Sequence, residues 1–238
     1  AAGVLGYVPP AHAPIKWELF GAFVTNPISL SRRKPAGRSG LIPFPGGFVL
    51  HTGYPNPGIE TSLRRYQNAW SHAPVPVIVH LIPHNADELA AMIPPLETCD
   101  NLAGLEVGIA PDISLDAATD LLQAALSELP IILRLPQDRA IELVRSLASF
   151  LEDGRITAIS LGPGRGSLPT PDGSFIRGRL YGPAVFPTAL AAVRTISEGS
   201  LPVIGAGGVY RQQDVQAMLA AGAVAVQLDT VLWRGGID

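Results

Sequence analysis

The stretch that decides the fold is residues 201–230, Leu-Pro-Val-Ile-Gly-Ala-Gly-Gly-Val-Tyr-Arg-Gln-Gln-Asp-Val-Gln-Ala-Met-Leu-Ala-Ala-Gly-Ala-Val-Ala-Val-Gln-Leu-Asp-Thr. It begins as an apolar strand that runs into the glycine pair Gly207-Gly208. A helical segment over 214–221 follows, and a second apolar strand occupies 223–228. Strands that are apolar on both faces are typical of a parallel sheet covered by helices. The stretch therefore predicts the end of a series of alternating strands and helices.

The glycine pair also raises the possibility of a binding site. Glycine adopts positive φ without strain and lets a ligand approach the backbone where a Cβ would otherwise stand. In a (β/α)₈ barrel, a phosphate commonly binds at the loops after the last two strands, on N–H groups at a helix start. We therefore favour a phosphate site at Gly207 and Gly208 over the alternative, in which the two glycines only form a tight turn.

The same alternation extends backwards through the chain. Further strands are expected at 21–25, 75–81, 102–109, 131–135 and 156–161, and helices at 60–70, 87–96, 115–126, 139–151 and 187–197. Residues 1–6 resemble the tail of a first strand, which makes 201–209 and 223–228 the seventh and eighth. Eight strands in one series predict a single α/β domain over residues 1–238, a (β/α)₈ TIM barrel that lacks a complete first strand and an eighth helix.

Two segments interrupt this alternation. Residues 43–58 are rich in glycine and proline and predict a hairpin or an active-site loop, with 53–56 at its tip. Residues 162–182 form an insertion rich in glycine and arginine. A basic loop over 32–38 is interpreted as a solvated face.

Composition limits the classes of function. A chain of 238 residues with 47% hydrophobic residues is globular and long enough for a barrel-sized core. The net charge of −3 gives no electrostatic case for nucleic acid. We expect no membrane span and a cytoplasmic protein, because no long apolar run and no signal-peptide pattern is present. Cys99 is the only cysteine, which excludes intramolecular disulfides and cysteine-rich metal sites.

Active-site side chains in this fold come from the C-terminal ends of strands. Arg134 interrupts the apolar strand over 131–135, and a buried cation needs a partner. Two explanations remain open and are compatible: an ion pair with Glu106 on the neighbouring strand, or stabilisation of negative charge on a bound group. Asp112, in the loop after the strand over 102–109, is either a proton acceptor or the N-cap of the next helix, and we favour the cap.

Three histidines also lie near predicted strand ends, namely His51, His80 and His84. No carboxylate spacing around them supports a metal site, so no metal is expected. We interpret them as solvated or core histidines rather than as proton-transfer groups.

Several motifs resemble the dihydroorotate dehydrogenase family of FMN barrels. The matching stretches are Arg-Leu-Tyr-Gly-Pro-Ala over 179–184, Pro-Val-Ile-Gly-Ala-Gly-Gly-Val over 202–209 and Val-Gln-Leu-Asp-Thr over 226–230. Gly-Tyr-Pro-Asn over 53–56 is similar to the family's Gly-Leu-Pro-Asn loop. The resemblance implies an FMN-dependent oxidoreductase with a small-molecule substrate, in a homo- or hetero-oligomer.

The resemblance also implies a set of cofactor-binding residues. Gly207, Gly208 and Thr230 would hold the FMN phosphate through backbone groups, and Asp229 would lie beside it, which is unfavourable unless its side chain turns away. Gly182 would approach the flavin, and Arg134 stands where the family has a flavin-contacting lysine. The remaining members are Ala2 and Gly3, under the ring system, and Asn26, in place of a lysine on the second strand.

The chain departs from the family where substrate binds. The family's Asn-Leu-Ser-Cys-Pro-Asn motif, which carries an asparagine and the catalytic base, is Val-Gly-Ile-Ala-Pro-Asp over 107–112, with Ala110 in place of the base. Leu50 and Pro163 replace two further asparagines. Since buried hydrogen-bonding groups give a site its strongest discrimination, we expect a substrate other than dihydroorotate, with Arg134 and Asp112 as candidate catalytic residues.

Two alternatives remain open. The first is a non-catalytic flavin-binding or scaffold barrel subunit, which the loss of the base and of the asparagines favours. The second is a flavin-free barrel that handles a phosphorylated metabolite, which fits the same glycines and which we rank last.

Overall fold

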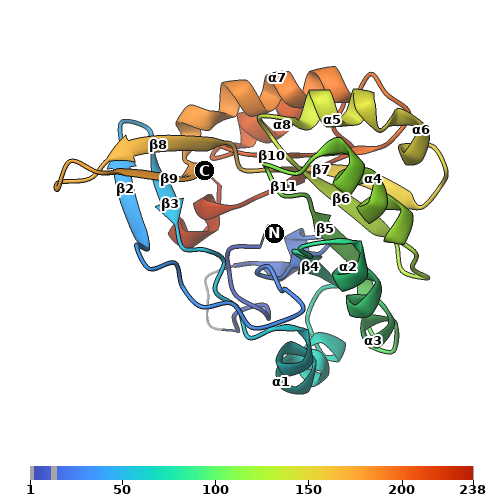
Figure 1. Ribbon diagram of the computed structural model, residues 1–238. Helices are drawn as coiled ribbons and strands as arrows, with labels where there is room; N and C mark the ends of the chain where they lie inside the picture. Colours follow the sequence, from blue (N-terminus) through green and yellow to red (C-terminus); the bar gives the residue numbers. More distant parts are fainter. Residues whose placement is uncertain (1–2, 12–14, 238) are drawn as a thin grey trace.

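The computed structural model describes residues 3–11 and 15–237. They form an α/β domain in which a curled parallel sheet carries helices on its outer face, with a small antiparallel sheet to one side (Figure 1). The parallel strands, in spatial order, are β1 (Phe23–Val24), β4 (Val77–Leu81), β5 (Leu102–Gly108), β6 (Ile131–Pro136), β7 (Ile156–Gly162), β10 (Val203–Ala206) and β11 (Ala225–Gln227).

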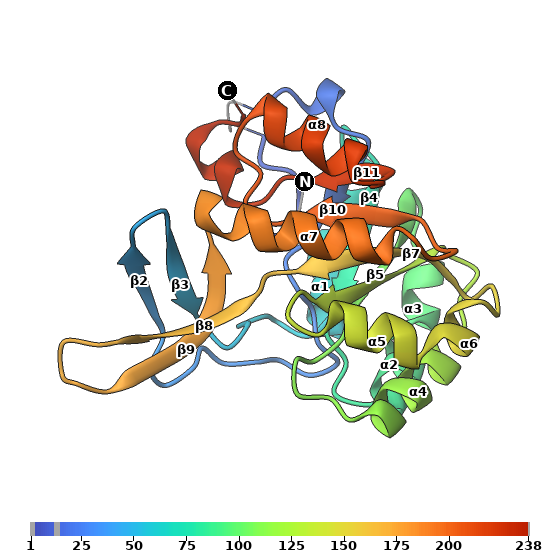
Figure 2. The ribbon, with the colours of Figure 1, turned by 90° about the horizontal axis from the view of Figure 1, so that it is seen from above.

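The spatial order of these strands follows their order in the chain, because each is joined to the next by a helical crossover. The helices are α1 (Ile59–Ser71), α2 (Ala86–Met92), α3 (Pro94–Glu97), α4 (Leu115–Ala124), α5 (Ala140–Ser146), α6 (Ala148–Leu151), α7 (Phe186–Ile196) and α8 (Gln212–Ala220). Three 3₁₀ turns are η1 (Trp17–Leu19), η2 (Pro183–Val185) and η3 (Thr230–Arg234). Figure 2 shows α4, α5, α7 and α8 along the outer face of the sheet. The helices thereby cover the outer face of the curled sheet (Figure 2).

The predicted helix over 87–96 is two helices in the structure. Asn85 caps α2, since its Oδ1 accepts the N–H of Glu88 at 2.9 Å. The chain then breaks at Ile93 because Pro94 and Pro95 have no N–H to continue the ladder, and α3 begins there.

The parallel sheet has seven strands in the described residues, one fewer than predicted. Residues 3–6, expected as the tail of a first strand, form no strand. The chain turns at Gly6, where φ is +105°, and Gly6 exchanges hydrogen bonds with Asn26: its N–H meets Asn26 Oδ1 at 3.0 Å, and its carbonyl accepts the Asn26 N–H at 2.7 Å. This turn directs the segment away from strand pairing. Strands β1 and β11 are therefore the two edges of the sheet.

The two segments that interrupt the alternation, predicted as a hairpin or active-site loop over 43–58 and as an insertion over 162–182, contribute to a second sheet. Strands β2 (Gly40–Phe44), β3 (Gly47–His51), β9 (Phe175–Tyr181) and β8 (Arg165–Pro169) form an antiparallel sheet in the order β2-β3-β9-β8. The β2–β3 hairpin turns at 45–46, where Gly46 has φ +85°, so the predicted tip at 53–56 is wrong. Residues 53–56 instead follow β3 and lead back toward the parallel sheet.

No helix in the described ranges combines the length and the apolar character needed to cross a bilayer. The apolar core lies between the parallel sheet and the helices, and it includes Phe23, Leu105, Leu133, Trp70 and Met92, all with no exposed side-chain surface.

Candidate active site

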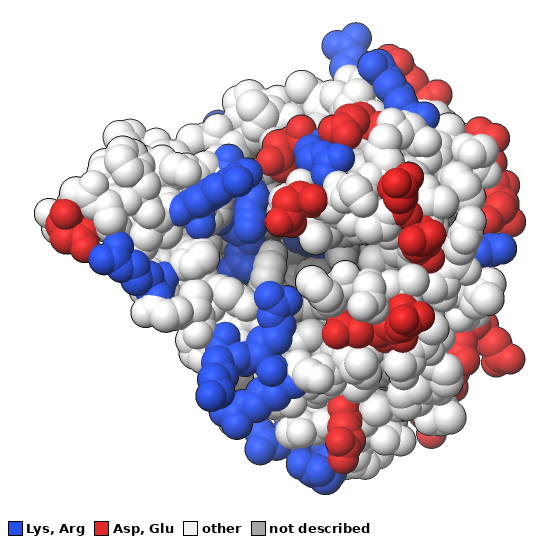
Figure 3. Space-filling model, viewed as in Figure 1, with Lys and Arg blue, Asp and Glu red and all other residues white. Residues whose placement is uncertain are grey.

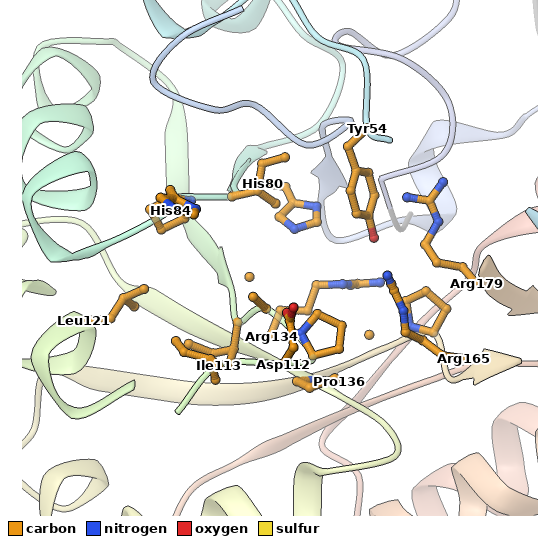
Figure 4. A pocket seen from close by; sticks show the side chains of 18 of the residues that line it. Tyr54, His80, His84, Asp112, Ile113, Leu121, Arg134, Pro136, Arg165 and Arg179 are labelled. Carbon is orange, nitrogen blue, oxygen red and sulfur yellow. The ribbon is translucent and has the colours of Figure 1, made fainter. Parts of the chain in front are cut away.

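A cavity of about 470 Å³ lies at the C-terminal ends of the parallel strands, where ligands bind in folds of this type. Its floor comes from strand ends and its roof from the loop after β3 and from the antiparallel sheet (Figure 4). The polar side chains that line it are Arg33, Tyr54, His80, His84, Asp112, Arg134, Arg165 and Arg179. We call this cavity the strand-end cavity.

Arg134 is held at the floor of the strand-end cavity by a buried polar network. Its Nη1 lies 3.2 and 3.1 Å from Oε1 and Oε2 of Glu106, a carboxylate with no exposed surface, so the predicted ion pair is confirmed. The same Nη1 donates to Oε1 of Gln227 at 2.9 Å. Ser160 Oγ and Gln227 Nε2 donate to Glu106 Oε1 at 2.8 and 2.6 Å. Glu106 on β5 and Gln227 on β11 thus hold the guanidinium directly, and Ser160 on β7 supports it through Glu106.

These contacts keep both partners charged. Burial raises the pKa of Glu106, but the positive charge of Arg134 and the hydrogen bonds from Gln227 and Ser160 lower it by more, so the net pKa lies below its ordinary value. Burial lowers the pKa of Arg134, but Glu106 raises it by more. The guanidinium is therefore a permanent cation beside the strand-end cavity.

His80, at the end of β4, is buried and neutral. Burial lowers its pKa to about 4, and although Glu106 raises that pKa, Arg134 and Arg179 lower it further. Its Nδ1 lies 3.7 Å from Glu106 Oε2. The expectation of a core histidine is confirmed for His80, whereas His84 is exposed at the cavity and His51 lies on β3 outside the lining. No metal-ligand cluster occurs among the described residues.

The depressed pKa of His80 predicts a loss of stability in mild acid. A histidine in the unfolded chain has a pKa of about 6.5. Because the unfolded chain binds the proton more tightly, the contribution of His80 is complete above pH 6.5 and is lost as the pH falls toward 4, by about 3 kcal/mol. Urea denaturation between pH 7 and pH 4 measures this slope. His80→Asn should flatten it, and the exposed control His84→Asn should not; equal slopes in the two variants would contradict the assignment.

A second cavity, of about 760 Å³, adjoins the glycine pair. It is lined by Pro183, Phe186, Pro187, Gly208, Tyr210, Arg211, Asp214, Val231, Arg234 and Gly236. Asp214 caps α8 by accepting the N–H groups of Tyr210 and Arg211 at 3.0 and 2.9 Å, and it pairs with Arg211 Nη2 at 2.9 Å. We call this second space the glycine-pair cavity. Arg211 and Arg234 give it cations that suit a phosphate.

Asp229 and Thr230 lie beside the glycine-pair cavity but do not line it. The Asp229 carboxylate is buried and accepts the N–H of Thr230 at 2.5 Å, while the Thr230 hydroxyl lies 2.8 Å from the hydroxyl of Tyr210. Burial raises the pKa of Asp229. The carboxylate is thus turned away from the cavity, onto the neighbouring residue.

The other predicted cofactor residues are occupied by packing. A Cβ on Gly3 would meet the carbonyl oxygen of Thr25, and a Cβ on Gly182, where φ is +115°, would meet Gly47 Cα. Asn26 is engaged with Gly6 as described above, and Ala2 lies outside the described residues. Of the predicted set, Arg134 lines the strand-end cavity and Gly208 lines the glycine-pair cavity.

The donor groups near the two cavities fit the chemistry of FMN. Its phosphate suits Gly208 together with Arg211 and Arg234, and its ring system suits the permanent cation Arg134. Near Gly207, Gln137 Oε1 is buried and accepts no hydrogen bond from the described residues, and it lies 3.7 Å from where a Cβ on Gly207 would stand. Such an acceptor suits a hydroxyl group of a ligand, and the ribityl chain of FMN carries several hydroxyl groups.

Asp112 lines the strand-end cavity and does not cap a helix, so the preferred prediction is wrong. Helix α4 begins at Leu115, and Ser114 caps it by accepting the N–H of Ala117 at 3.2 Å. The helix starts two residues later than a cap at Asp112 requires. Asp112 remains as an acid exposed at the cavity.

Sequence reasoning missed the arginines of the roof, although it had marked the segment that contains Tyr54 as a hairpin or active-site loop. Arg179 is buried and stacks on the ring of Tyr54, with 3.8 Å between its Cζ and the ring centroid, and its Nη2 donates to Thr52 Oγ1 at 3.0 Å. Arg165 joins it from β8, and Arg33, assigned to a solvated face, also lines the cavity. The alternation of arginine with other residues along 175–181 was the available signal for a strand.

Comparison with known proteins agrees with this architecture. The family model described as dihydroorotate dehydrogenase matches residues 170–238. The catalytic subunit of dihydroorotate dehydrogenase B (NAD(+)) from Geotalea daltonii is 27% identical, in an alignment that covers 97% of this chain and 81% of that protein. The corresponding subunit from Pelobacter propionicus is 28% identical, with the same coverage of 97% and 81%.

A solved structure supports the fold. The crystal structure of DHODH in complex with ferulenol from Eimeria tenella superimposes with a TM-score of 0.72 at 12% identity, and covers 90% of this chain and 70% of that one. Sequence motifs, family match, relatives and fold agree with one another. The chain is therefore similar to dihydroorotate dehydrogenases in sequence and in fold.

Proposed function

We propose that this chain is an FMN-dependent oxidoreductase that acts on a small molecule other than dihydroorotate. The observation that carries the proposal is Arg134, a permanent cation fixed by Glu106 at the floor of a cavity at the strand ends. FMN is the cofactor of the dihydroorotate dehydrogenase family, and when bound it supplies the electron transfer. The protein's own part is to bind, to orient and to set the local charge.

In this proposal the phosphate of FMN binds at Gly207-Gly208 with Arg211 and Arg234, beside Thr230 and Asp229. Gly3, Asn26 and Gly182 act through packing, by fixing the backbone around the cofactor. Arg134 stabilises negative charge on the ring, and Asp112 accepts the substrate proton at its carboxylate. The support for Asp112 is its place in the lining of the same cavity as Arg134 (Figure 4).

The proposed change of substrate rests on the lining of the strand-end cavity. Ala110 and Pro163 line it at positions where the resemblance implies a base and an asparagine, and neither side chain donates or accepts a hydrogen bond. Guanidinium groups and the Tyr54 ring are present instead. A cavity with these groups selects a different molecule from one lined by amides.

We also propose that the curled sheet belongs to a (β/α)₈ barrel, with the place for a further strand between β11 and β1. The bacterial relatives are named as catalytic subunits, which supports an oligomer with a partner subunit. The alternative of a non-catalytic flavin-binding subunit is favoured by Ala110, whose methyl group cannot take a proton.

The purified protein is expected to contain flavin and to show no oxidation of dihydroorotate. The visible absorbance of flavin and chromatography of the released cofactor measure the first point, and bleaching of that absorbance by dihydroorotate under anaerobic conditions measures the second. A protein that neither retains nor takes up FMN would overturn the proposed cofactor. If dihydroorotate bleaches the flavin, the proposed change of substrate is overturned. If another electron donor bleaches the flavin and Asp112→Asn abolishes that bleaching, the result supports an enzyme over a non-catalytic subunit.

A further inference from the structure

The roof of the strand-end cavity carries two arginines that no part of the proposed flavin site uses. We infer that Arg165 and Arg179 form a clamp for a substrate with at least two negative charges. The inference rests on the proposed function for the identity of this cavity as the substrate site, and it adds the chemical class of that substrate. We refer to the two residues as the arginine clamp.

Arg179 is prepared to bind an anion. It is 8% exposed, it is stacked on Tyr54, and Thr52 accepts one of its N–H groups. Its Nε is buried and has no hydrogen-bond partner among the described residues. A buried donor without a partner is costly, and a guanidinium whose position is already fixed loses little entropy when an anion binds to it. The stacking and the unpartnered donor are both explained if a ligand supplies the acceptor.

Arg165 stands directly opposite Arg179. The two are register partners in the antiparallel β8–β9 pair, so their side chains leave the sheet on the same face, and both line the strand-end cavity. Like charges in directly opposite positions are destabilising. Within the described residues neither arginine has a carboxylate partner; the ion pairs there involve other residues. An anion between the two guanidinium groups would remove the repulsion.

The net charge of the strand-end cavity also favours an anionic ligand. Four arginines line it, namely Arg33, Arg134, Arg165 and Arg179, against one carboxylate, Asp112. Glu106 lies beneath the floor and is already engaged by Arg134. Figure 3 shows Lys and Arg side chains bordering the hollow near the centre of this face, on the side of the antiparallel sheet. A positively charged, partly enclosed cavity concentrates anions. With Arg134 paired to Glu106 and Asp112 offsetting one further arginine, two positive charges remain, which a ligand with two negative charges would neutralise.

The FMN phosphate does not account for the clamp. The glycine-pair cavity has its own cations, Arg211 and Arg234, and the linings of the two cavities share no residue. Figure 4 shows Arg165, Arg179 and Tyr54 together at one side of the strand-end cavity, with His84 and Leu121 at the other. The clamp therefore faces a ligand that lies above the strand ends, where the reacting part of a substrate would be held.

Anion titration of the full-length, as-purified protein tests the clamp. Inorganic phosphate, succinate and acetate are titrated at constant ionic strength, with heat of binding as the readout, and flavin content is measured on the same samples. We expect phosphate or succinate to bind at least tenfold more tightly than acetate. The stronger of the two identifies the substrate as a phosphate ester or as a dicarboxylate.

Variants assign the binding to the clamp. Arg165→Met and Arg179→Met should each weaken binding of the preferred dianion tenfold or more. Arg177→Met is the matched control, because Arg177 is exposed on the same strand β9 and does not line the cavity. Arg165 is only partly buried, so its variant keeps the test valid if Arg179→Met fails to fold.

Equal binding of acetate and the dianions, or equal effects of Arg165→Met and Arg177→Met, would overturn the clamp. Suppose that the protein takes up no flavin, prefers dianions, and loses this preference in the clamp variants. That result would support the clamp and contradict the proposed cofactor. A protein that contains flavin but shows no preference for dianions would support the proposed cofactor and contradict the clamp.

Discussion

Arg134→Met is expected to lower the free energy of unfolding by about 3–5 kcal/mol, because removing one partner leaves the other as a buried, uncompensated charge. Glu106 has no exposed surface, and its two oxygens both face Nη1 of Arg134 at 3.1–3.2 Å. Ser160 and Gln227 would still donate to the carboxylate but carry no charge. Chemical denaturation at pH 7 measures the loss.

The double variant Glu106→Gln/Arg134→Met is the control for this explanation. Replacing both partners removes the uncompensated charge, so most of the lost stability should return. Arg134→Lys keeps a cation near Glu106 and should retain much of the stability. An Arg134→Met protein as stable as the parent would show that the ion pair does not carry the energy assigned to it.

The same variants separate a redox role of Arg134 from a structural one. If FMN binds as proposed, Arg134→Met should lower its reduction potential, since the cation favours negative charge on the reduced ring, and Arg134→Lys should largely keep it. Glu106 offsets part of this effect because its charge lies close to the same guanidinium. A stability loss without any change in potential would leave Arg134 with the structural role alone.

The parallel sheet was largely predictable from sequence because its strands are short apolar runs bounded by turns. Strands β4, β5, β6 and β7 lie within one or two residues of the predicted ranges. The antiparallel sheet was not predicted, because β9 pairs with β3, more than 120 residues earlier in the chain. In β9 (Phe175–Tyr181) the apolar residues stand in pairs at the two ends, at 175–176 and 180–181, on either side of Arg177-Gly178-Arg179. Neither a strict alternation nor a continuous apolar run therefore marks the segment as a strand.

The candidate site was predictable where a single residue conflicts with its surroundings. Arg134 stood out as a cation in an apolar strand, and Glu106 was its neighbour on the next strand. Arg165 and Arg179 conflict with nothing in sequence, since each lies in a polar segment. Their juxtaposition depends on the register of β8 against β9 and on the packing of Tyr54, which are tertiary properties.

The glycine pair gives the second large expected effect. Gly208 has φ +70°, and a Cβ there would lie 2.5 Å from the backbone nitrogen of Phe186 and 3.0 Å from the carbonyl oxygen of Gly182. Left-handed backbone costs a residue with a Cβ about 1–2 kcal/mol, and forcing a methyl group into a packed space costs about 1–3 kcal/mol more. Gly208→Ala should therefore lose about 2–5 kcal/mol of stability, as measured by denaturation.

Crowding and backbone strain can be separated with a matched glycine. Gly173 has φ +79°, and no atom lies within 4 Å of where its Cβ would stand, so Gly173→Ala pays the conformational cost alone. Flavin content adds the functional readout, because the turn at Gly208 can move only by shifting the backbone that lines the glycine-pair cavity. We expect bound FMN to fall at least tenfold in Gly208→Ala and to be unchanged in Gly173→Ala. Equal stability losses would exclude crowding at Gly208, and full flavin occupancy in Gly208→Ala would exclude the phosphate site proposed there.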